Sequence, residues 1–168
     1  MAGVYVFPGG KLDEADRTLG IGGLLDQPTA TLHTRLAEPG TDAATASGLH
    51  VAALREALEE CGLLLAEATA ADRPLDALQT RQLAPWSRWI TPLSPTVSSR
   101  RFDTRFFVAL APAGQTALHD NEETTESVWV APRTALEQYR DGRIDLAPPQ
   151  IMSLAHLARH ASANSVLQ

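Results

Sequence analysis

Hydrophobic and polar residues recur along the chain with two different periods, and these periods predict which segments form helices and which form strands. Between residues 49 and 61 the apolar positions follow the spacing of one helix face, which comprises Val51, Leu54, Ala57, Leu58 and Cys61. Gly62 comes directly after them, and a glycine at this place is typical of the left-handed residue that ends a helix. The pattern therefore predicts a helix over Leu49–Cys61.

Other segments show shorter signals of both kinds. Apolar runs predict strands at Val4–Phe7, Trp89–Thr91, Thr104–Leu110 and Ser127–Val130. Helices are predicted over Asp72–Leu83, from Pro132 to about Asp141, from Pro148 through Ala158 and, as a shorter element, around Thr31–Glu38. Strands mixed with helices, without an internal repeat, indicate one α/β domain over residues 1–168.

The polar side of the Leu49–Cys61 helix carries three carboxylates, Glu56, Glu59 and Glu60, within an arc of about 100°. Like charges three and four residues apart disfavour a helix by about 0.2–0.5 kcal/mol per pair, and the cation within one turn is Arg55. A bound divalent cation would turn this repulsion into attraction. Oxygen ligands without His or Cys favour Mg²⁺ or Mn²⁺ over Zn²⁺. The alternative is a solvated acidic helix face.

A second motif lies near the start, where an apolar strand runs into Pro8-Gly9-Gly10. The two segments together resemble the Nudix hydrolase box, G-x5-E-x7-R-E-U-x-E-E-x-G-U, in which U is a bulky aliphatic residue. The matching residues are Gly10, Arg55, Glu56, Glu59, Glu60, Gly62 and Leu63, with Ala57 at the first U. Asp16 stands where the box has glutamate, and 38 residues rather than seven separate it from Arg55.

The extra residues form an insertion at about 17–48 inside the box. The free-energy cost of closing a flexible loop grows by only about 0.6 kcal/mol per doubling of its length, so both halves of the box can still meet. Loops of this length inside a compact domain are usually lids or binding segments, or else disordered. We expect a substrate-facing flap.

Further segments resemble the branch of Nudix proteins that includes the peroxisomal coenzyme A diphosphatase, which also has an interrupted box. They are Trp89-Ile90-Thr91-Pro92, Arg100-Arg101-Phe102-Asp103-Thr104 and the acidic run Asp120–Glu126 that precedes Trp129. The resemblance implies a Nudix-type α/β/α sandwich with a mixed sheet. Strands that normally precede the Pro-Gly-Gly turn are not seen in this sequence, and we expect a homodimer that covers the exposed sheet.

The resemblance also implies roles for individual residues. The metal site would comprise Glu56, Glu59, Glu60 and the Gly9 carbonyl, and it would hold Mg²⁺ or Mn²⁺. Catalysis would involve Glu59, Arg55 and Glu123, with Arg55 orienting the glutamates and Glu123 acting as a general base or an additional ligand. Glu122 and Asp120 are near substitutes for Glu123, and a solvated acidic turn is the alternative for this run.

Substrate contacts are predicted at Gly10 and at the arginines Arg100 and Arg101, with Arg105 nearby, because guanidinium groups suit phosphate oxygens. An ion pair between Arg101 and Asp103 is the alternative. His156 and His160 have the i, i+4 spacing of zinc ligands, but a third ligand is not evident in the sequence, so we expect them on the exposed side of a helix.

The net charge of −6 argues against a nucleic-acid binder, and no apolar run approaches the roughly 20 residues of a membrane span. We therefore expect a cytoplasmic protein. The predicted activity is metal-dependent hydrolysis of the pyrophosphate bond in a small nucleotide conjugate: coenzyme A, or else NADH, ADP-ribose or a dinucleoside polyphosphate. The alternative is an inactive nucleotide-binding or regulatory Nudix remnant.

Overall fold

The computed structural model describes residues 4–21, 25–65, 79–92, 101–115 and 127–167. By its internal contacts the chain forms two compact units, and each is considered by itself. One comprises Pro8–Ala84 and Ala109–Trp129, and the other comprises Met1–Phe7, Pro85–Val108 and Val130–Gln168. The helices and strands of these units confirm the α/β class expected from the sequence.

Helix α3 (Ala43–Cys61) is the central helix of the first unit. It begins six residues before the predicted Leu49, because the Asp42 side chain accepts a hydrogen bond from the Thr45 amide at 2.7 Å and caps the helix. It ends where predicted, since Gly62 has φ 65° in the left-handed region and its amide reaches back to Leu58. Val51 and Leu54 are buried, as the apolar pattern predicted.

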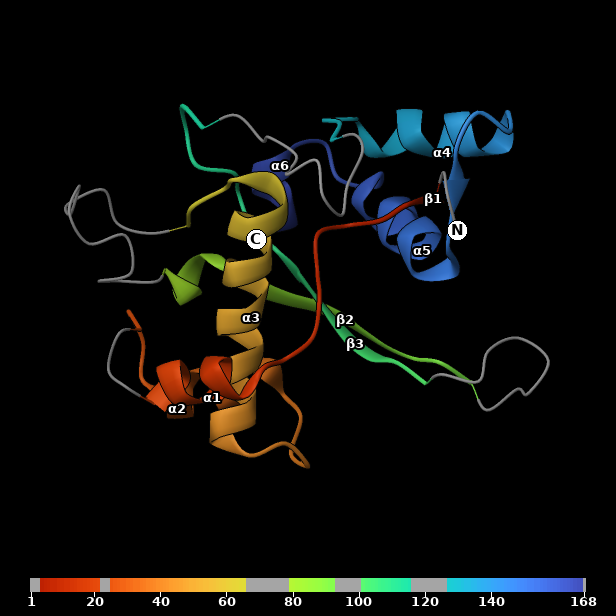
Figure 1. The fold of residues 1–168 in the computed structure, drawn as a ribbon. Helices are drawn as coiled ribbons and strands as arrows, with labels where there is room; N and C mark the ends of the chain where they lie inside the picture. Colours follow the sequence, from red (N-terminus) through yellow and green to blue (C-terminus); the bar gives the residue numbers. More distant parts are fainter. Residues whose placement is uncertain (1–3, 22–24, 66–78, 93–100, 116–126, 168) are drawn as a thin grey trace. The chain divides into compact units, whose positions relative to one another are not determined.

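In the ranges that the structure describes, the insertion is packed against this unit and does not form the expected flap. Helices α1 (Glu14–Ile21) and α2 (Thr29–Leu36) lie against α3, as Figure 1 shows in red and orange. Leu32 is fully buried and Leu36 nearly so. The predicted short helix is thus confirmed as α2, whereas α1 was not predicted.

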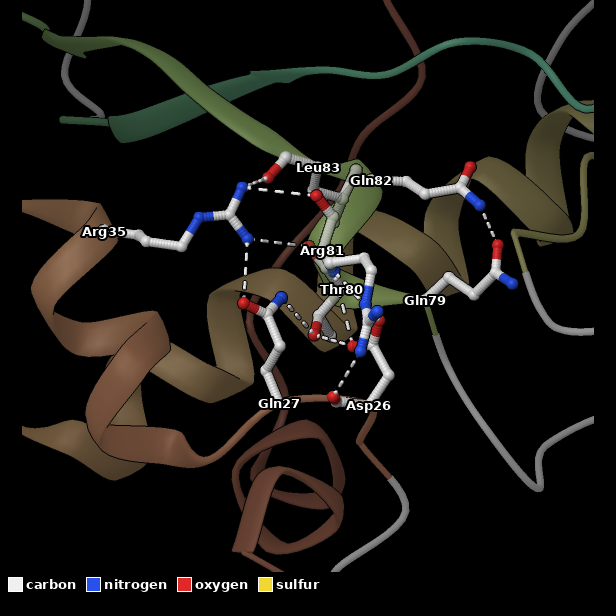
Figure 2. Close-up of polar contacts among 8 residues, drawn as sticks. All are labelled: Asp26, Gln27, Arg35, Gln79, Thr80, Arg81, Gln82 and Leu83. Atoms are coloured by element: carbon white, nitrogen blue, oxygen red, sulfur yellow. Dashed lines mark hydrogen bonds and ion pairs between the residues drawn. The ribbon is translucent and has the colours of Figure 1, made fainter.

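A network of polar contacts fastens the insertion to residues 79–83, just before strand β2 (Figure 2). The Asp26 carboxylate accepts from Arg81 Nε at 2.8 Å and from the Thr80 hydroxyl. From α2, Arg35 donates to the carbonyl oxygens of Thr80 at 3.4 Å and Leu83 at 2.6 Å. Thr80 is fully buried, so these backbone and hydroxyl groups need partners within the protein.

The second unit contains two small sheets. Strand β1 (Val4–Tyr5) pairs in parallel with β4 (Asp145–Leu146), and β2 (Ala84–Ile90) pairs with β3 (Asp103–Val108). Figure 1 shows β2 and β3 side by side, in green. The described residues of this unit also form the helices α4 (Pro132–Arg140) and α5 (Pro148–Leu157) and the short α6 (Ala163–Val166).

Several predicted boundaries are confirmed and others are wrong. Helices α4 and α5 begin at the prolines that predicted them, because proline suits the first helical position. Residues 127–130 form no strand, and Val128 and Trp129 are 53% and 63% exposed. Most of the predicted Asp72–Leu83 helix lies outside the described residues, and its described end, Thr80–Gln82, is the 3₁₀-helix η1.

In the part of the chain that the structure describes, no helix has the length and apolar character needed to cross a bilayer.

Candidate active site

Arg55 is the centre of a cluster of carboxylates on α3. Its Nε and NH2 atoms bind the two oxygens of Asp16 at 3.0 Å and 3.1 Å, in the forked geometry that suits a carboxylate. Its NH1 atom binds Glu56 Oε1 and Glu59 Oε2, each at 2.8 Å. The Lys11 carbonyl accepts the remaining hydrogen bond from NH2 at 2.9 Å. The predicted role of Arg55 in orienting these glutamates thus has a direct geometric basis.

Asp16 reaches Arg55 although it is shorter than the glutamate of the box. It lies in the first turn of α1, is 1% exposed, and accepts a hydrogen bond from the Asp13 amide at 2.9 Å. This backward contact is the one that the third residue of a helix makes in a capping box, so it fixes the Asp16 side chain at the start of α1. The close approach of α1 to α3 therefore replaces the missing methylene.

The Gly9-Gly10 turn lies against the same helix face. The Gly9 amide donates to Glu60 Oε2 at 3.0 Å. At Gly10 a Cβ atom would lie 2.1 Å from Glu56 Oε1 and 2.5 Å from Glu56 Cδ, which is far inside van der Waals contact. Gly10 is therefore needed for the Glu56 carboxylate to occupy its position, a role that the sequence did not reveal.

The charge balance of the cluster favours a cation. Four carboxylates, those of Asp13, Asp16, Glu56 and Glu59, lie within 4.0 Å of one guanidinium. Hydrogen bonding by Asp16, with further contributions from Glu59 and Glu56, raises the pKa of Arg55 above its ordinary value, so the guanidinium stays charged. One guanidinium does not balance the charge of four carboxylates, so the cluster has a net negative charge.

The donor set suits a hard divalent cation. Arg55 engages one oxygen each of Glu56 and Glu59, and among the described residues no hydrogen bond or ion pair engages the second oxygen of either. These ligands are all oxygen atoms, which Mg²⁺ and Mn²⁺ prefer. Over the described ranges of the chain, no three His, Cys, Asp or Glu side chains form a ready-made metal-ligand group. The assignment of the metal ligands stays a prediction that the donor chemistry supports.

Four predicted site residues lie outside the part of the chain that the structure describes, namely Glu123, its substitutes Glu122 and Asp120, and Arg100. Arg101 is exposed. The alternative pairing of Arg101 with Asp103 is wrong.

Asp103 instead binds Arg88 on β2 through two contacts of 2.7 Å and Arg105 at 3.0 Å. The hydrogen bond from Arg88 lowers the pKa of the Asp103 carboxyl below its ordinary value.

Two contacts of Arg55 were not predicted, those with Asp13 and with the Lys11 carbonyl. Asp13 precedes α1 and stands three residues before Asp16, a spacing typical of a helix start. This signal was available in the sequence, but most of α1 lies in the insertion at about 17–48, which we interpreted as a loop. The Lys11 contact uses a backbone carbonyl oxygen. Every residue has this group, so the sequence could not indicate the contact.

Known proteins resemble this chain in sequence and in structure. Residues 75–157 match the family model of the NUDT19 Nudix domain. The acyl-coenzyme A diphosphatase NUDT19 of Xenopus laevis is 41% identical over 85 residues, which are 50% of this chain and 22% of that protein. The acyl-coenzyme A diphosphatase NUDT19 of Gallus gallus is 26% identical over 225 residues, covering 99% of this chain and 60% of that protein.

The chain thus spans less than two thirds of the length of these two relatives. A solved structure, that of a Nudix hydrolase from Alicyclobacillus acidocaldarius, matches with a TM-score of 0.72 and 27% identity, covering 97% of this chain and 79% of that one. The family model begins after α3, whereas this structural match includes the box itself. The family match, the relatives and the solved structure together support a Nudix hydrolase of the NUDT19 branch.

Proposed function

We propose that this protein hydrolyses the pyrophosphate bond of a nucleoside diphosphate linked to another group, with Mg²⁺ or Mn²⁺ as cofactor. The observation that carries the proposal is the Arg55 cluster, in which one guanidinium holds Glu56 and Glu59 on a single helix face beside the Gly9-Gly10 turn. Hydrolysis of a phosphoanhydride places further negative charge on oxygens that are already anionic. A site with excess carboxylates can act on such a substrate only with a bridging cation.

Glu56, Glu59, Glu60 and the Gly9 carbonyl would hold the divalent ion, which supplies charge neutralisation at the phosphate oxygens and acidifies the attacking water. Arg55 keeps two of these carboxylates in position through NH1, and Asp16 keeps Arg55 in position from the buried side. The Glu59 side chain is 57% exposed, so water and substrate can reach it. Glu59 is therefore our candidate for proton transfer, with Glu123 as the second predicted acid.

Coenzyme A or its acyl esters are the substrates we propose first. Two relatives that are acyl-coenzyme A diphosphatases support this choice. Arg100, Arg101 and Gly10 are the proposed substrate contacts. NADH, ADP-ribose and dinucleoside polyphosphates contain the same type of bond and belong in the same assay. A cytoplasmic location and a homodimer are further parts of the proposal.

A panel assay tests the proposed function. The full chain is incubated with each substrate class in the presence of Mg²⁺, Mn²⁺ or EDTA, and products are identified by mass spectrometry. We expect metal-dependent cleavage of coenzyme A into an adenosine bisphosphate and a phosphopantetheine fragment. Tight binding of substrates without cleavage under any metal condition would instead indicate a regulatory Nudix remnant.

A further inference from the structure

The second unit contains a cavity that the proposed hydrolysis does not use. Its volume is about 420 Å³, within the range of small-molecule sites, and it is lined by Trp86, His156, Arg159 and His160. Trp86 lies on β2, His156 lies in the last turn of α5, and the other two residues follow that helix. All four belong to the same compact unit, so the cavity is a feature of that unit alone.

The aromatic groups of the cavity have a defined mutual geometry. The rings of Trp86 and His156 meet edge to face, with centroids 6.2 Å apart and planes at 75°. The indole of Trp86 also lines the cavity, so part of its aromatic surface borders the space that a planar ligand could occupy. Trp86 is half-buried, and the indole is therefore held in place while part of it meets the cavity.

His160 presents one defined nitrogen atom. Its Nδ1 lies 2.9 Å from the Ser165 carbonyl oxygen. Because a carbonyl oxygen can only accept, Nδ1 must carry the proton and donate. In the neutral ring Nε2 is then an acceptor, and in the protonated ring it is a second donor. The contact with Ser165 thus fixes the orientation of the imidazole toward a ligand.

The polar groups of the cavity favour an anion. Its described lining contains one guanidinium and two imidazoles and no carboxylate. Over the residues that the structure describes, Arg159 forms neither an ion pair nor a side-chain hydrogen bond, so its five donors can bind a ligand. The carbonyls of Leu154, His156 and Leu157 at the end of α5 accept amide hydrogen bonds, which reduces their repulsion of a nearby anion.

We propose that this cavity is a second binding site, separate from the Nudix box, for a nucleoside monophosphate. Its base stacks on the indole of Trp86, and its phosphate binds the forked guanidinium of Arg159. Base stacking on aromatic side chains tolerates different bases, so the site selects the combination of ring and phosphate more strongly than base identity. This proposal does not depend on the hydrolytic function.

The test uses isothermal titration of the full chain in EDTA with AMP, adenosine and inorganic phosphate as separate probes. We expect AMP to bind at least about tenfold more tightly than either fragment, since each fragment makes half of the contacts. Arg159→Gln should weaken AMP binding by about tenfold or more, and Arg159→Lys should recover only part of it because lysine lacks the fork. Glu59→Gln, which alters the Nudix box, should leave AMP binding unchanged.

Basic residues after a helix also stabilise it through the helix dipole, so thermal unfolding is measured in parallel. A purely structural Arg159 would lower the unfolding temperature in Arg159→Gln without changing AMP affinity, and that result would overturn the proposal. So would equal affinity for phosphate and AMP, no AMP binding, or binding lost in Glu59→Gln but retained in Arg159→Gln. Chemical-shift changes at the Trp86 indole and the His160 ring on adding AMP would support it.

Discussion

At the scale of single residues, the site depends on how Arg55 distributes its five donors. Nε and NH2 bind Asp16 on the buried side, and NH1 is shared by two glutamates on the exposed side. The guanidinium therefore holds the carboxylates of Glu56 and Glu59 in a fixed position relative to Asp16, which lies at the buried start of α1. The resemblance to the box placed Asp16 at the position of its glutamate, whereas the contacts around Arg55 depend on the fold.

Asp16→Asn should lower both activity and stability. The substitution keeps the shape of the side chain and removes the charge that holds Arg55, while Asp16 itself is almost fully buried. Losing one partner of a buried ion pair costs about 3–5 kcal/mol, and because Arg55 is 26% exposed we expect about 1–3 kcal/mol in urea unfolding. Turnover should fall by about tenfold or more.

Asp13→Asn is the matched control, since this carboxylate lies 4.0 Å from Arg55 and its side chain is 65% exposed. We expect its unfolding free energy to stay within about 0.5 kcal/mol of the natural sequence. Equal losses in Asp13→Asn and Asp16→Asn would show that the buried pair has no special role.

Gly10→Ala should impair turnover far more than stability. A methyl group at this position would displace the Glu56 carboxylate, which is the flexible end of a side chain and can move at little cost to the fold. Displacement of about 1 Å at a reacting centre can reduce a rate by about 100-fold. Gly40→Ala, where no heavy atom lies within 4 Å of the added Cβ, is the control. Natural turnover in Gly10→Ala would refute this placement of Glu56.

At the scale of elements, the position of Asp16 depends on the packing of α1 against α3. Gly48 lies at this crossing, and a Cβ atom there would be 3.2 Å from the Arg17 Cα and 3.0 Å from Leu12 Cδ1. The backbone of α1 cannot yield as a flexible side chain can. The glycine thus allows the close approach by which aspartate serves in place of glutamate.

Gly48→Ala should therefore destabilise the protein. Helix propensity alone predicts a gain of about 0.5–1 kcal/mol for alanine in a helix, whereas forcing a methyl group into a packed contact costs about 1–3 kcal/mol. We expect the packing term to exceed the propensity term in chemical unfolding, with a loss of activity because α1 carries Asp16. A stabilised protein with full turnover would contradict this account of the crossing.

Elements with strong local signals were predictable from the sequence. Gly62 ends α3, and prolines start α4 and α5, because these residues act through their own backbone geometry. Elements that depend on distant partners were not. Helices α1 and α2 have eight residues each and are too short to be stable alone, so their packing on α3 decides their structure.

The predicted strand Ser127–Val130 failed for the same reason. Val128, Trp129 and Val130 favour extended structure, but a strand needs a hydrogen-bonded neighbour, and none is assigned to these residues in the described chain. The composition of a short segment cannot supply that neighbour.

At the scale of the whole molecule, stability should depend on pH through His50. This histidine is fully buried in α3, and burial lowers the pKa of its imidazole below the ordinary value. The unfolded chain therefore binds a proton more readily than the folded one. The free energy of unfolding should be highest above about pH 6.5 and should decrease as the pH falls below it, toward the lower folded pKa.

Urea unfolding at several pH values between 5 and 8 measures this dependence, with His50→Gln as the comparison. The variant should show a smaller decrease in stability toward acid pH, since glutamine does not titrate. Identical slopes in the two proteins would exclude His50 as the source.

The Nudix resemblance could also be predicted at this scale, from the spacing of Arg55, Glu56, Glu59 and Glu60. The role of the insertion was not, because a sequence read as a loop gives no sign of Asp26 and Arg35 binding residues 79–83. Nor did the sequence indicate the cavity beside Trp86, which is formed by residues about 70 positions apart.

The central claim is that the carboxylates around Arg55 catalyse metal-dependent phosphoanhydride hydrolysis. The most direct test is the turnover of coenzyme A with saturating Mn²⁺ by the natural chain and by Glu59→Gln, with circular dichroism to verify the fold. We predict that the natural chain cleaves coenzyme A and that the folded variant is slower by about 100-fold or more. Equal turnover by the two proteins would contradict the claim.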